Sequence, residues 1–344
     1  MKVLVTGANG LLGHHLVAAL QARGDSVQAL VLPNEDISPL QERSVAVYRG
    51  DIRQPETLAE PMQGVEGVFH LAAMMGAWRS MEDYNAVNVT GTENVCRAAL
   101  TAGVKRLVHI SSAMVYRLWS GAPVTEEAPL MPLNEPYAMS KAEGDRLVQR
   151  LIARDGLPAT IVRPGTLFGP GDRMNFGRIA DRVRSGKAVI VGSGTNPVPF
   201  VYITDVVDAL LLAFDSDRAL GQAYNVGHDE PLTQAELLGA ISKELGCMPP
   251  STHVPYRPLL AASWVAERIS SLGGYRWQPP ATRHGVRLYG GSNRISIEKA
   301  RRDLGYAPRV GLREGIRIAA TWYREHVLPS ESSLVLNGNA ANTN

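Results

Sequence analysis

Short apolar runs alternate with longer amphipathic segments through the first half of this 344-residue chain. The runs KVLVTG, SVQALVLP, GVEGVFHLAA, VKRLVHISS and LPATIVRPG each have the length and composition of a buried strand. Parallel strands must be joined by crossovers of about a dozen residues or more, and the segments between these runs are long enough to form helices. The alternation therefore predicts an α/β fold built on a doubly wound parallel sheet.

Composition and charge narrow the classes of partner. The formal net charge is +2, so no overall field favours nucleic acid. No apolar run reaches the roughly 18 residues that a membrane span needs, and no secretory signal follows Met1, so we expect a cytoplasmic protein without a membrane span. Cys96 and Cys247 lie far apart and suggest neither a disulfide framework nor a metal site. A small-molecule partner is the expectation that remains.

Three glycines follow the first apolar run, in TGANGLLGHHL. Gly7, Gly10 and Gly13 stand where the first strand is expected to turn into a helix. Glycines at such a turn let a pyrophosphate approach the backbone, and the helix N-terminus offers free amides to it. The spacing is G-x-x-G-x-x-G rather than the general G-x-G-x-x-G. The motif indicates a dinucleotide site, and the alternative is a plain tight turn.

The position expected to read the ribose of such a cofactor is apolar. Val31 ends the second strand, where an acidic residue would bind a ribose 2′-hydroxyl, and no arginine stands there to bind a 2′-phosphate. Glu35 and Asp36 follow, and their charge should repel a 2′-phosphate. This favours NAD and leaves NADP open. The alternative is that both acidic residues are solvated turn residues.

The segment YAMSK places Tyr137 and Lys141 four residues apart on an expected helix, hence on one face. A neighbouring ammonium favours the phenolate and brings the pKa of the tyrosine toward the working pH. Ser112 lies at the C-terminal end of the expected strand VKRLVHISS, at the edge of the sheet where ligands bind in open parallel folds. Taken singly, these are a surface pair and a turn serine. Taken together, they predict acid–base chemistry on a substrate oxygen.

Several motifs together resemble the extended short-chain dehydrogenase/reductases, also called the NAD-dependent epimerase/dehydratase family. The resemblance covers about residues 1–325. It rests on TGANGLLG, GDI at 50–52, HLAA at 70–73, NVTGT at 88–92, HISSAMVY at 109–116, YAMSK, RPGTLFGPGD at 163–172 and FVYITDVVDAL at 200–210. It implies a Rossmann fold with a smaller, discontinuous C-terminal substrate-binding region, and a homodimer formed through helices near 84–102 and 137–154.

The resemblance also implies roles for individual residues. Ser112, Tyr137 and Lys141 would be catalytic, with Lys141 holding the nicotinamide ribose. The residues it places at the cofactor are Gly7, Asn9, Gly10, Leu11, Leu12, Gly13, Asp51, Ile52, Leu71, Ala72, Ala73, Asn88, Tyr137, Lys141 and Pro164. Asp51 would reach the adenine amino group. Asn88 would support the active site, and a helix-packing amide is its alternative.

The C-terminal part departs from the nucleotide-sugar members of that family. Their arginine-rich signature is not obvious, and a solvated helix face is the favoured interpretation of the candidates Arg173, Arg178, Arg182 and Arg184. GAW at 76–78, the segment 279–308 and the apolar run 259–272 resemble the 3β-hydroxysteroid dehydrogenase-like branch. An apolar cap of this kind suggests an apolar ligand. The residues expected to line its pocket are Met75, Trp78, Met114 and Gly165, with Trp119 and Trp264 as further candidates.

These observations converge on an oxidoreductase. We expect NAD(P)-dependent interconversion of a secondary alcohol and a ketone on a small, apolar substrate. The alternatives are a nucleotide-sugar epimerase or dehydratase, which oxidises its substrate transiently, and a cofactor-binding regulator without chemistry. The expected division assigns residues 1–166, with 201–226 returning to them, to the dinucleotide-binding domain. Residues 167–200 and 227–327 form the substrate-binding region, and 328–344 form a flexible tail.

Overall fold

The computed structural model describes residues 1–76, 78–117 and 122–328, so Trp119 and residues 329–344 of the expected tail lie outside the described residues. A seven-stranded parallel sheet occupies the centre, in the order β10-β6-β5-β4-β1-β2-β3. Its strands are β1 (Lys2–Thr6), β2 (Ser26–Val31), β3 (Ala46–Arg49), β4 (Gly67–His70), β5 (Arg106–Ile110), β6 (Ala159–Pro164) and β10 (Ala223–Val226). The chain winds outward from β1 in both directions, which confirms the expected doubly wound α/β fold.

The register aligns the carboxyl ends of the central strands at one edge of the sheet. Thr6 of β1 pairs with His70 of β4, and His70 pairs with His109 of β5. On the other half, Pro164 of β6 pairs with Val226 of β10. Strand order reverses where β4 and β2 flank β1, and in open α/β sheets such a reversal opens a crevice at this edge. The fold therefore directs the loops after β1, β4, β5 and β6 toward one place.

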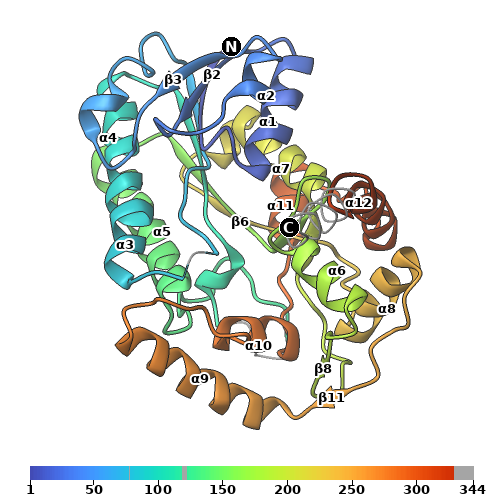
Figure 1. The fold of residues 1–344 in the computed structure, drawn as a ribbon. Helices are drawn as coiled ribbons and strands as arrows, with labels where there is room; N and C mark the ends of the chain where they lie inside the picture. The colour runs from blue at the N-terminus through green and yellow to red at the C-terminus, as the bar shows by residue number, and fades with distance from the viewer. Residues whose placement is uncertain (77, 118–121, 329–344) are drawn as a thin grey trace, which may run out of the picture.

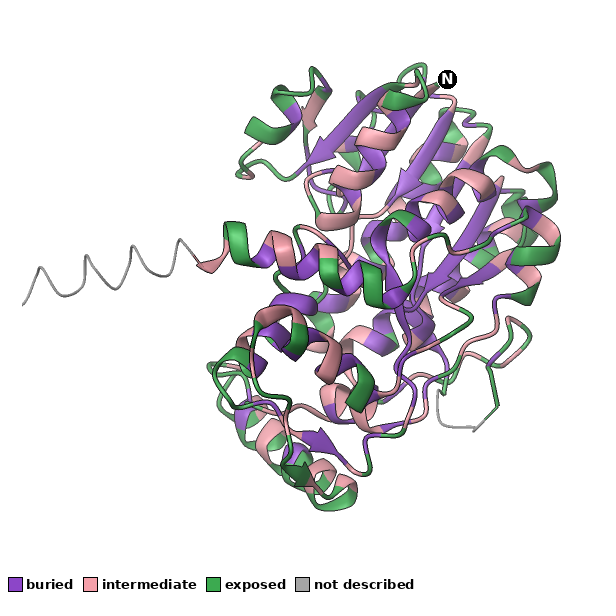
Figure 2. Cartoon of the chain, turned by 90° about the vertical axis from the view of Figure 1, so that its right-hand side faces the viewer, coloured by how far each residue is buried: buried purple, intermediate pink, exposed green. Residues whose placement is uncertain are grey.

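Helices cover both faces of the sheet (Figure 1), and most sheet residues are buried between them (Figure 2). One face is covered by α1 (Leu11–Ala22), α7 (Ile203–Asp215) and α11 (Glu298–Leu304), which share one apolar core with the strands. The other face is covered by α3 (Met81–Asn85), η2 (Ala86–Gly91), α4 (Thr92–Thr101) and α5 (Pro136–Asp155). Strand β10 therefore joins the sheet, and α7 packs on it. Helix α11, which comes later in the chain, packs on the same face.

The longest helix, α5, has clear sequence signals at both ends. Pro136 occupies its first turn, where a missing amide hydrogen costs nothing. Gly156 ends it in the left-handed conformation, with φ of +68°. Its buried residues face the sheet and α4, so the helix that carries Tyr137 and Lys141 is anchored along its length.

The helix expected near 84–102 is longer and less regular than the sequence suggests. It begins at Met81, continues through a π-helical segment at Ala86–Gly91, and ends at Thr101. Ser80 and Asp83 form a capping box at its start. The π-helical turn displaces the backbone by one residue and turns Asn88 inward, a distortion often found near functional sites.

The remaining described elements build the C-terminal region and short connections. A second core joins α6 (Phe176–Arg184), α8 (Gln234–Leu245) and α12 (Leu312–His326). Two helices, α9 (Tyr256–Leu272) and α10 (Arg283–Gly290), lie at the lower end of Figure 1, below the N-terminus of α5. The short elements are β7 (Thr166–Phe168) with β9 (Phe200–Tyr202), β8 (Ile190–Val191) with β11 (His253–Val254), α2 (Ser38–Gln41), η1 (Pro55–Leu58), η3 (Ala113–Val115) and η4 (Asp217–Ala219).

Gly144 supplies a direct test of the packing of α5. A Cβ at this position would lie 2.4 Å from the backbone oxygen of Asn88, so α5 and η2 approach more closely than any side chain allows. We expect Gly144→Ala to lower the free energy of unfolding by about 1–3 kcal/mol, because the two helices must separate. The matched control is Gly239→Ala in α8, where nothing lies within 4 Å. That change should be neutral or stabilising by up to about 1 kcal/mol. Equal effects of the two changes in urea unfolding would contradict this account.

Candidate functional site

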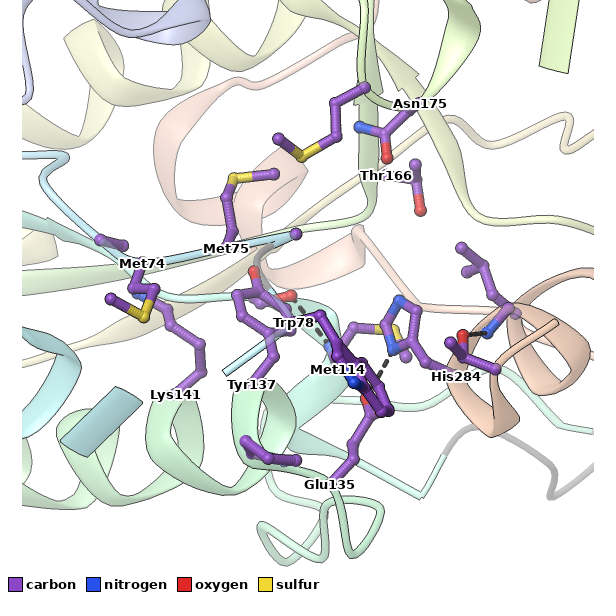
Figure 3. Close-up of a pocket in the computed structure, with 18 of the residues that line it drawn as sticks. Met74, Met75, Trp78, Met114, Glu135, Tyr137, Lys141, Thr166, Asn175 and His284 are labelled. Carbon is purple, nitrogen blue, oxygen red and sulfur yellow. Dashed lines mark hydrogen bonds and ion pairs between the residues drawn. The ribbon is translucent and has the colours of Figure 1, made fainter. Parts of the chain in front are cut away.

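A cavity of about 1280 Å³ lies at the carboxyl edge of the sheet, between the sheet and α6, α9 and α10. Figure 3 shows part of its wall. The structure brings most of the residues expected from the sequence into its lining. These are Gly7, Gly10, Leu11, Leu12, Gly13, Asp51, Ile52, Leu71, Ala72, Ala73, Met75, Trp78, Ser112, Met114, Tyr137, Lys141, Pro164 and Gly165, together with Trp264.

The three glycines at one end of the cavity are each required, or tolerated, for a different structural reason. Gly7 has φ of +68°, and a Cβ there would lie 2.7 Å from the Ala72 amide. A Cβ on Gly13 would lie 2.4 Å from the Gly7 carbonyl oxygen, so α1 can start against the turn only with glycine at this position. Gly10 is the N-cap residue of α1 and has no such backbone clash. Its missing side chain leaves the N-terminus of α1 open to the cavity, which is where a phosphate can accept hydrogen bonds from free amides.

Two expected cofactor residues do not line this cavity. The Asn9 side chain donates to the Asp36 carbonyl oxygen at 2.8 Å and so bridges two turns. Asn88 is buried, and its amide is engaged by the backbone of Met74 and by Ser140. It therefore holds the loop after β4 against α5, which is the helix-packing alternative considered for it.

The end of the cavity where the family resemblance places the adenine holds a charge pair that the sequence did not suggest. Arg53 donates to both carboxylate oxygens of Asp51 through its side chain, and this contact lowers the pKa of Asp51. The Arg53 side chain is half exposed and lines the cavity. Glu35 also lines it, whereas Asp36 does not. Both signs of charge are thus present where a ribose would lie, and the NAD preference inferred from Glu35 stays a proposal.

Ser112, from the loop after β5, lines the same cavity as Tyr137 and Lys141. Figure 3 shows Tyr137 and Lys141 on α5. Ser112 is buried, and its hydroxyl accepts from the Met114 amide at 3.2 Å. A side-chain hydrogen bond joins Ser112 to Tyr137. Lys141 lies one helical turn farther, where its Nζ donates to the Ile110 carbonyl oxygen at 2.7 Å. A phenol and a hydroxyl are therefore hydrogen-bonded, and an ammonium lies in the wall of the same cavity.

The electrostatics of these groups differ from the sequence expectation in one respect. Burial raises the pKa of Tyr137, and the hydrogen bond with Ser112 offsets part of that rise. Lys141 is not among the groups that move the tyrosine pKa, because its ammonium is turned to the Ile110 carbonyl. Burial lowers the pKa of Lys141 itself to about 8, against the opposing charge of Asp145. The expected lowering by Lys141 is therefore not present in this arrangement.

Asp145, one turn beyond Lys141, belongs to a buried polar network. It forms a two-pronged ion pair with Arg163 of β6, with both N···O distances 2.8 Å. Ser111 donates to the same carboxylate at 2.6 Å, and Arg163 also donates to the Tyr116 hydroxyl at 2.6 Å. That hydroxyl in turn donates to Asn225 of β10. The network joins α5 to three neighbouring strands directly beneath the site. No single stretch of sequence reveals it, because each partner comes from a different element.

Part of the cavity wall is apolar, but Arg173, Arg178 and Arg182 also line the cavity, so the expectation that they form only a solvated helix face is wrong for these three. Met75, Trp78 and Met114 lie around the end of Tyr137 (Figure 3). Trp78 packs on Tyr275, and its indole donates to Ser270 of α9 at 2.7 Å. Gly165 is required by packing, because a Cβ there would lie 2.2 Å from the Pro199 carbonyl oxygen. Helices α9 and α10, called the cap helices below, thus cover the apolar part of the cavity.

Sequence reasoning missed one polar pair in this wall. His284, in the first turn of α10, lies beside Tyr137 and contacts Glu135 at the start of α5. The local sequence ATRHGV carries no motif that signals this, because the partner is 149 residues away.

No helix in the described ranges is both long and apolar enough to cross a membrane. Across the same ranges, no three potential metal-ligating side chains gather into a group.

Comparisons with known proteins agree with the geometry. The model of the NAD dependent epimerase/dehydratase family matches residues 3–227. The 2-alkyl-3-oxoalkanoate reductase of Stenotrophomonas maltophilia (strain K279a) is 34% identical over 326 residues, covering 92% of this chain and 98% of the relative. The 3beta-hydroxysteroid-dehydrogenase/decarboxylase isoform 1 of Arabidopsis thaliana is 33% identical over 342 residues, covering 91% of this chain and 77% of the relative.

A solved structure supports the same fold. The UDP-glucose 4-epimerase of Thermus thermophilus, in a complex with NAD, superposes with a TM-score of 0.76 at 28% identity. The match covers 95% of this chain and all of that one (100%). The parallel sheet and its C-terminal region are thus an arrangement that other proteins of this kind share.

The network beneath the site can be tested through Asp145. Asp145→Asn removes the charge that pairs with Arg163, whose side chain is only 2% exposed. A buried, uncompensated guanidinium should lower the free energy of unfolding by roughly 3–5 kcal/mol. The control is Glu93→Gln, which breaks the exposed pair with Arg97 on α4 and should cost about 0.5 kcal/mol or less. A loss for Asp145→Asn as small as that of the control, in urea unfolding, would contradict the structural role of the pair.

Proposed function

This chain belongs to the NAD dependent epimerase/dehydratase family, and from that premise we propose that it interconverts a ketone and a secondary alcohol on a small apolar substrate. As a member it is an NAD(P)-dependent dehydrogenase or reductase, so a regulator without chemistry has no support. The single observation that carries the proposal is the meeting of Ser112, Tyr137 and Lys141 in one cavity with an apolar wall.

The cavity fits a dinucleotide at its glycine end. Gly10 leaves room where a side chain would project, and the amides at the N-terminus of α1 have no side-chain cap. The residues proposed to hold the cofactor are Gly10, Leu11 and Leu12 at the pyrophosphate, Asp51 and Ile52 at the adenine, Leu71, Ala72 and Ala73 beneath the ribose, and Lys141 and Pro164 near the nicotinamide. When bound, a nicotinamide cofactor supplies or accepts the hydride.

Tyr137 is proposed to move the proton. In reduction its phenol donates a proton to the carbonyl oxygen as that oxygen becomes a hydroxyl, and in oxidation the phenolate takes the proton back. Ser112 hydrogen-bonds with Tyr137 and is placed to hold the same substrate oxygen. Lys141 lies in the same cavity wall, and its ammonium stabilises negative charge that develops on oxygen. The raised pKa keeps the buried Tyr137 phenol protonated, so that a proton is available for the carbonyl oxygen in reduction.

The related reductase, named for an alkyl oxoalkanoate, favours net reduction over epimerisation as the activity of this chain. The epimerase among the similar structures keeps the second interpretation open. We propose NAD as the cofactor because Glu35 lies in the cavity wall near the ribose position. We also propose a homodimer formed through α4 and α5, which lie against each other on the outside of the sheet.

The decisive experiment is incubation of the purified protein with NADH or NADPH and a panel of apolar ketones and nucleotide sugars. A reductase should consume the reduced cofactor in proportion to a product two mass units heavier, whereas an epimerase should change its substrate without net consumption. Faster oxidation of NADH than of NADPH is expected from Glu35. Turnover confined to nucleotide sugars would overturn the proposal.

The proton transfer is tested by Tyr137→Phe, which removes only the phenolic hydroxyl. We expect turnover to fall by roughly 10²-fold or more, the scale of acid–base catalysis, while cofactor affinity changes little. Tyr48→Phe makes the same chemical change on the edge strand β3 and should leave both unchanged. Turnover is measured by nicotinamide absorbance and affinity by fluorescence titration. Wild-type turnover in Tyr137→Phe would refute the assignment.

A further inference from the structure

His284 places a polar group beside Tyr137 that the mechanism above does not use. The two rings meet edge to face, with centroids 6.2 Å apart and planes at 86°. Nδ1 of His284 lies 2.5 Å from Oε1 of Glu135, the residue that precedes α5. Figure 3 shows the imidazole next to Met114 and Trp78, on the substrate side of the tyrosine.

The position of His284 is held from several sides. Thr282 caps α10 by accepting from the Gly285 amide at 3.2 Å. The neighbouring Arg283 donates to Glu267 of α9 through both its backbone amide and its side chain, and to the Asn134 carbonyl oxygen. The cap helices are therefore tied to the start of α5 at the point where the imidazole enters the cavity.

The contact with Glu135 sets the protonation of the ring. Burial alone would lower the pKa of His284, but the carboxylate of Glu135, with a smaller contribution from Glu267 on α9, raises it above the usual value. The charged or titratable groups packed around the ring are Glu135 and Tyr137 from α5, Glu267 from α9 and Arg283 from its own helix. Because the Glu135 carboxylate accepts from Nδ1–H, the other nitrogen, Nε2, carries a hydrogen only in the cationic ring.

That other nitrogen has no partner within the described part of the chain. Nε2 makes no hydrogen bond there, and 31% of the His284 side chain stays accessible in the cavity wall. Met75, Trp78 and Met114 lie near it, and the same cavity wall also carries the polar side chains of Thr166 and Asn175. In the cationic ring this N–H can donate to a substrate oxygen, and a buried donor left unpaired penalises a substrate that lacks such an oxygen.

We propose that His284 is a specificity-determining residue whose Nε2 donates a hydrogen bond to a second oxygen of the substrate. The proposal rests on the function assigned above, in which Tyr137 and Ser112 hold the reacting carbonyl oxygen. Because the two rings are neighbours, the second oxygen must belong to the same small head group. The substrate class that fits is a β-oxo acyl compound, in which one carbon separates the ketone from a carboxylate or thioester carbonyl. Its apolar chain would lie against Met75 and Trp78.

The test compares a β-oxo acid, its thioester and the simple ketone of matched chain length. His284→Phe keeps the ring packing against Tyr137 and removes both nitrogens. We expect the ratio of kcat/KM for the β-oxo acid to that for the simple ketone to fall by roughly 10- to 100-fold, mostly through KM, as for the loss of a charged hydrogen bond. His284→Gln, which retains a donor, should restore part of the preference for the thioester. His326→Phe, on the exposed face of α12, is the control and should leave the ratio unchanged.

The pH dependence separates binding from a structural role. The raised pKa means that the cation is present below that pKa and is lost as pH rises through it. KM for the β-oxo acid should therefore increase at higher pH, and KM for the simple ketone should not. Glu135→Gln removes the group that raises the pKa and should move this increase to lower pH. Thermal unfolding of each variant checks that the fold is retained.

The outcomes distinguish this inference from the proposed function. If Tyr137→Phe turns over at the wild-type rate, the proposed function fails. If Tyr137→Phe is inactive but His284→Phe lowers kcat/KM equally for all three substrates, or for none, the role of His284 is overturned and the proposed function stands. An unchanged ratio that coincides with a pH-independent KM for the acid would likewise overturn it.

Discussion

The buried ion pair between Asp145 and Arg163 is the contact on which the arrangement of the site depends. It joins α5 to β6, and through Ser111 it also reaches the loop that carries Ser112. Neither side chain is more than 2% exposed, so each charge relies on the other for its compensation. A pair of this kind contributes little net stability, but its geometry permits one placement of α5 on the sheet. Tyr137 and Lys141 are positioned by that placement.

The close approach of α5 to the π-helical segment completes the placement from the outer side. Because Gly144 has no side chain, the Asn88 carbonyl oxygen can occupy the space that a Cβ would fill. The Asn88 side-chain amide then ties the loop after β4 to Ser140. Helix α5 is therefore fixed on its sheet side by the Asp145–Arg163 ion pair and on the side of η2 by the backbone contact at Gly144. The cap helix α10 docks on its first turn through Glu135 and Arg283. One rigid helix thus connects the sheet, the proposed proton donor and the substrate cap.

Several residues that resemble cofactor contacts have structural duties as well. Gly7 and Gly13 are required by the backbone atoms of Ala72, Gly7 and Ala8, so only Gly10 of the three is left free for a ligand. Asn88 has no free polar group for the cavity, and Lys141 donates to the strand end rather than to Tyr137. These duties explain why a motif shared by a family reports the fold more directly than the role of each residue in it.

The sequence by itself determined the doubly wound parallel sheet, with five of its seven strands, the glycine turn and the helix carrying Tyr137 and Lys141, because periodicity and turn chemistry act over a few neighbouring residues. It also determined, through the resemblance of many short motifs, the family and the class of cofactor. Only the tertiary structure decided the pairing of Asp145 with Arg163, the charge pair of Asp51 with Arg53 beside the ribose position, and the contact of His284 with Glu135. The partners of two of these pairs come from different elements, and the third pair matters only because the fold turns it toward the cavity. Pairing energy and burial act between side chains in space, and the order of residues along the chain does not record that proximity.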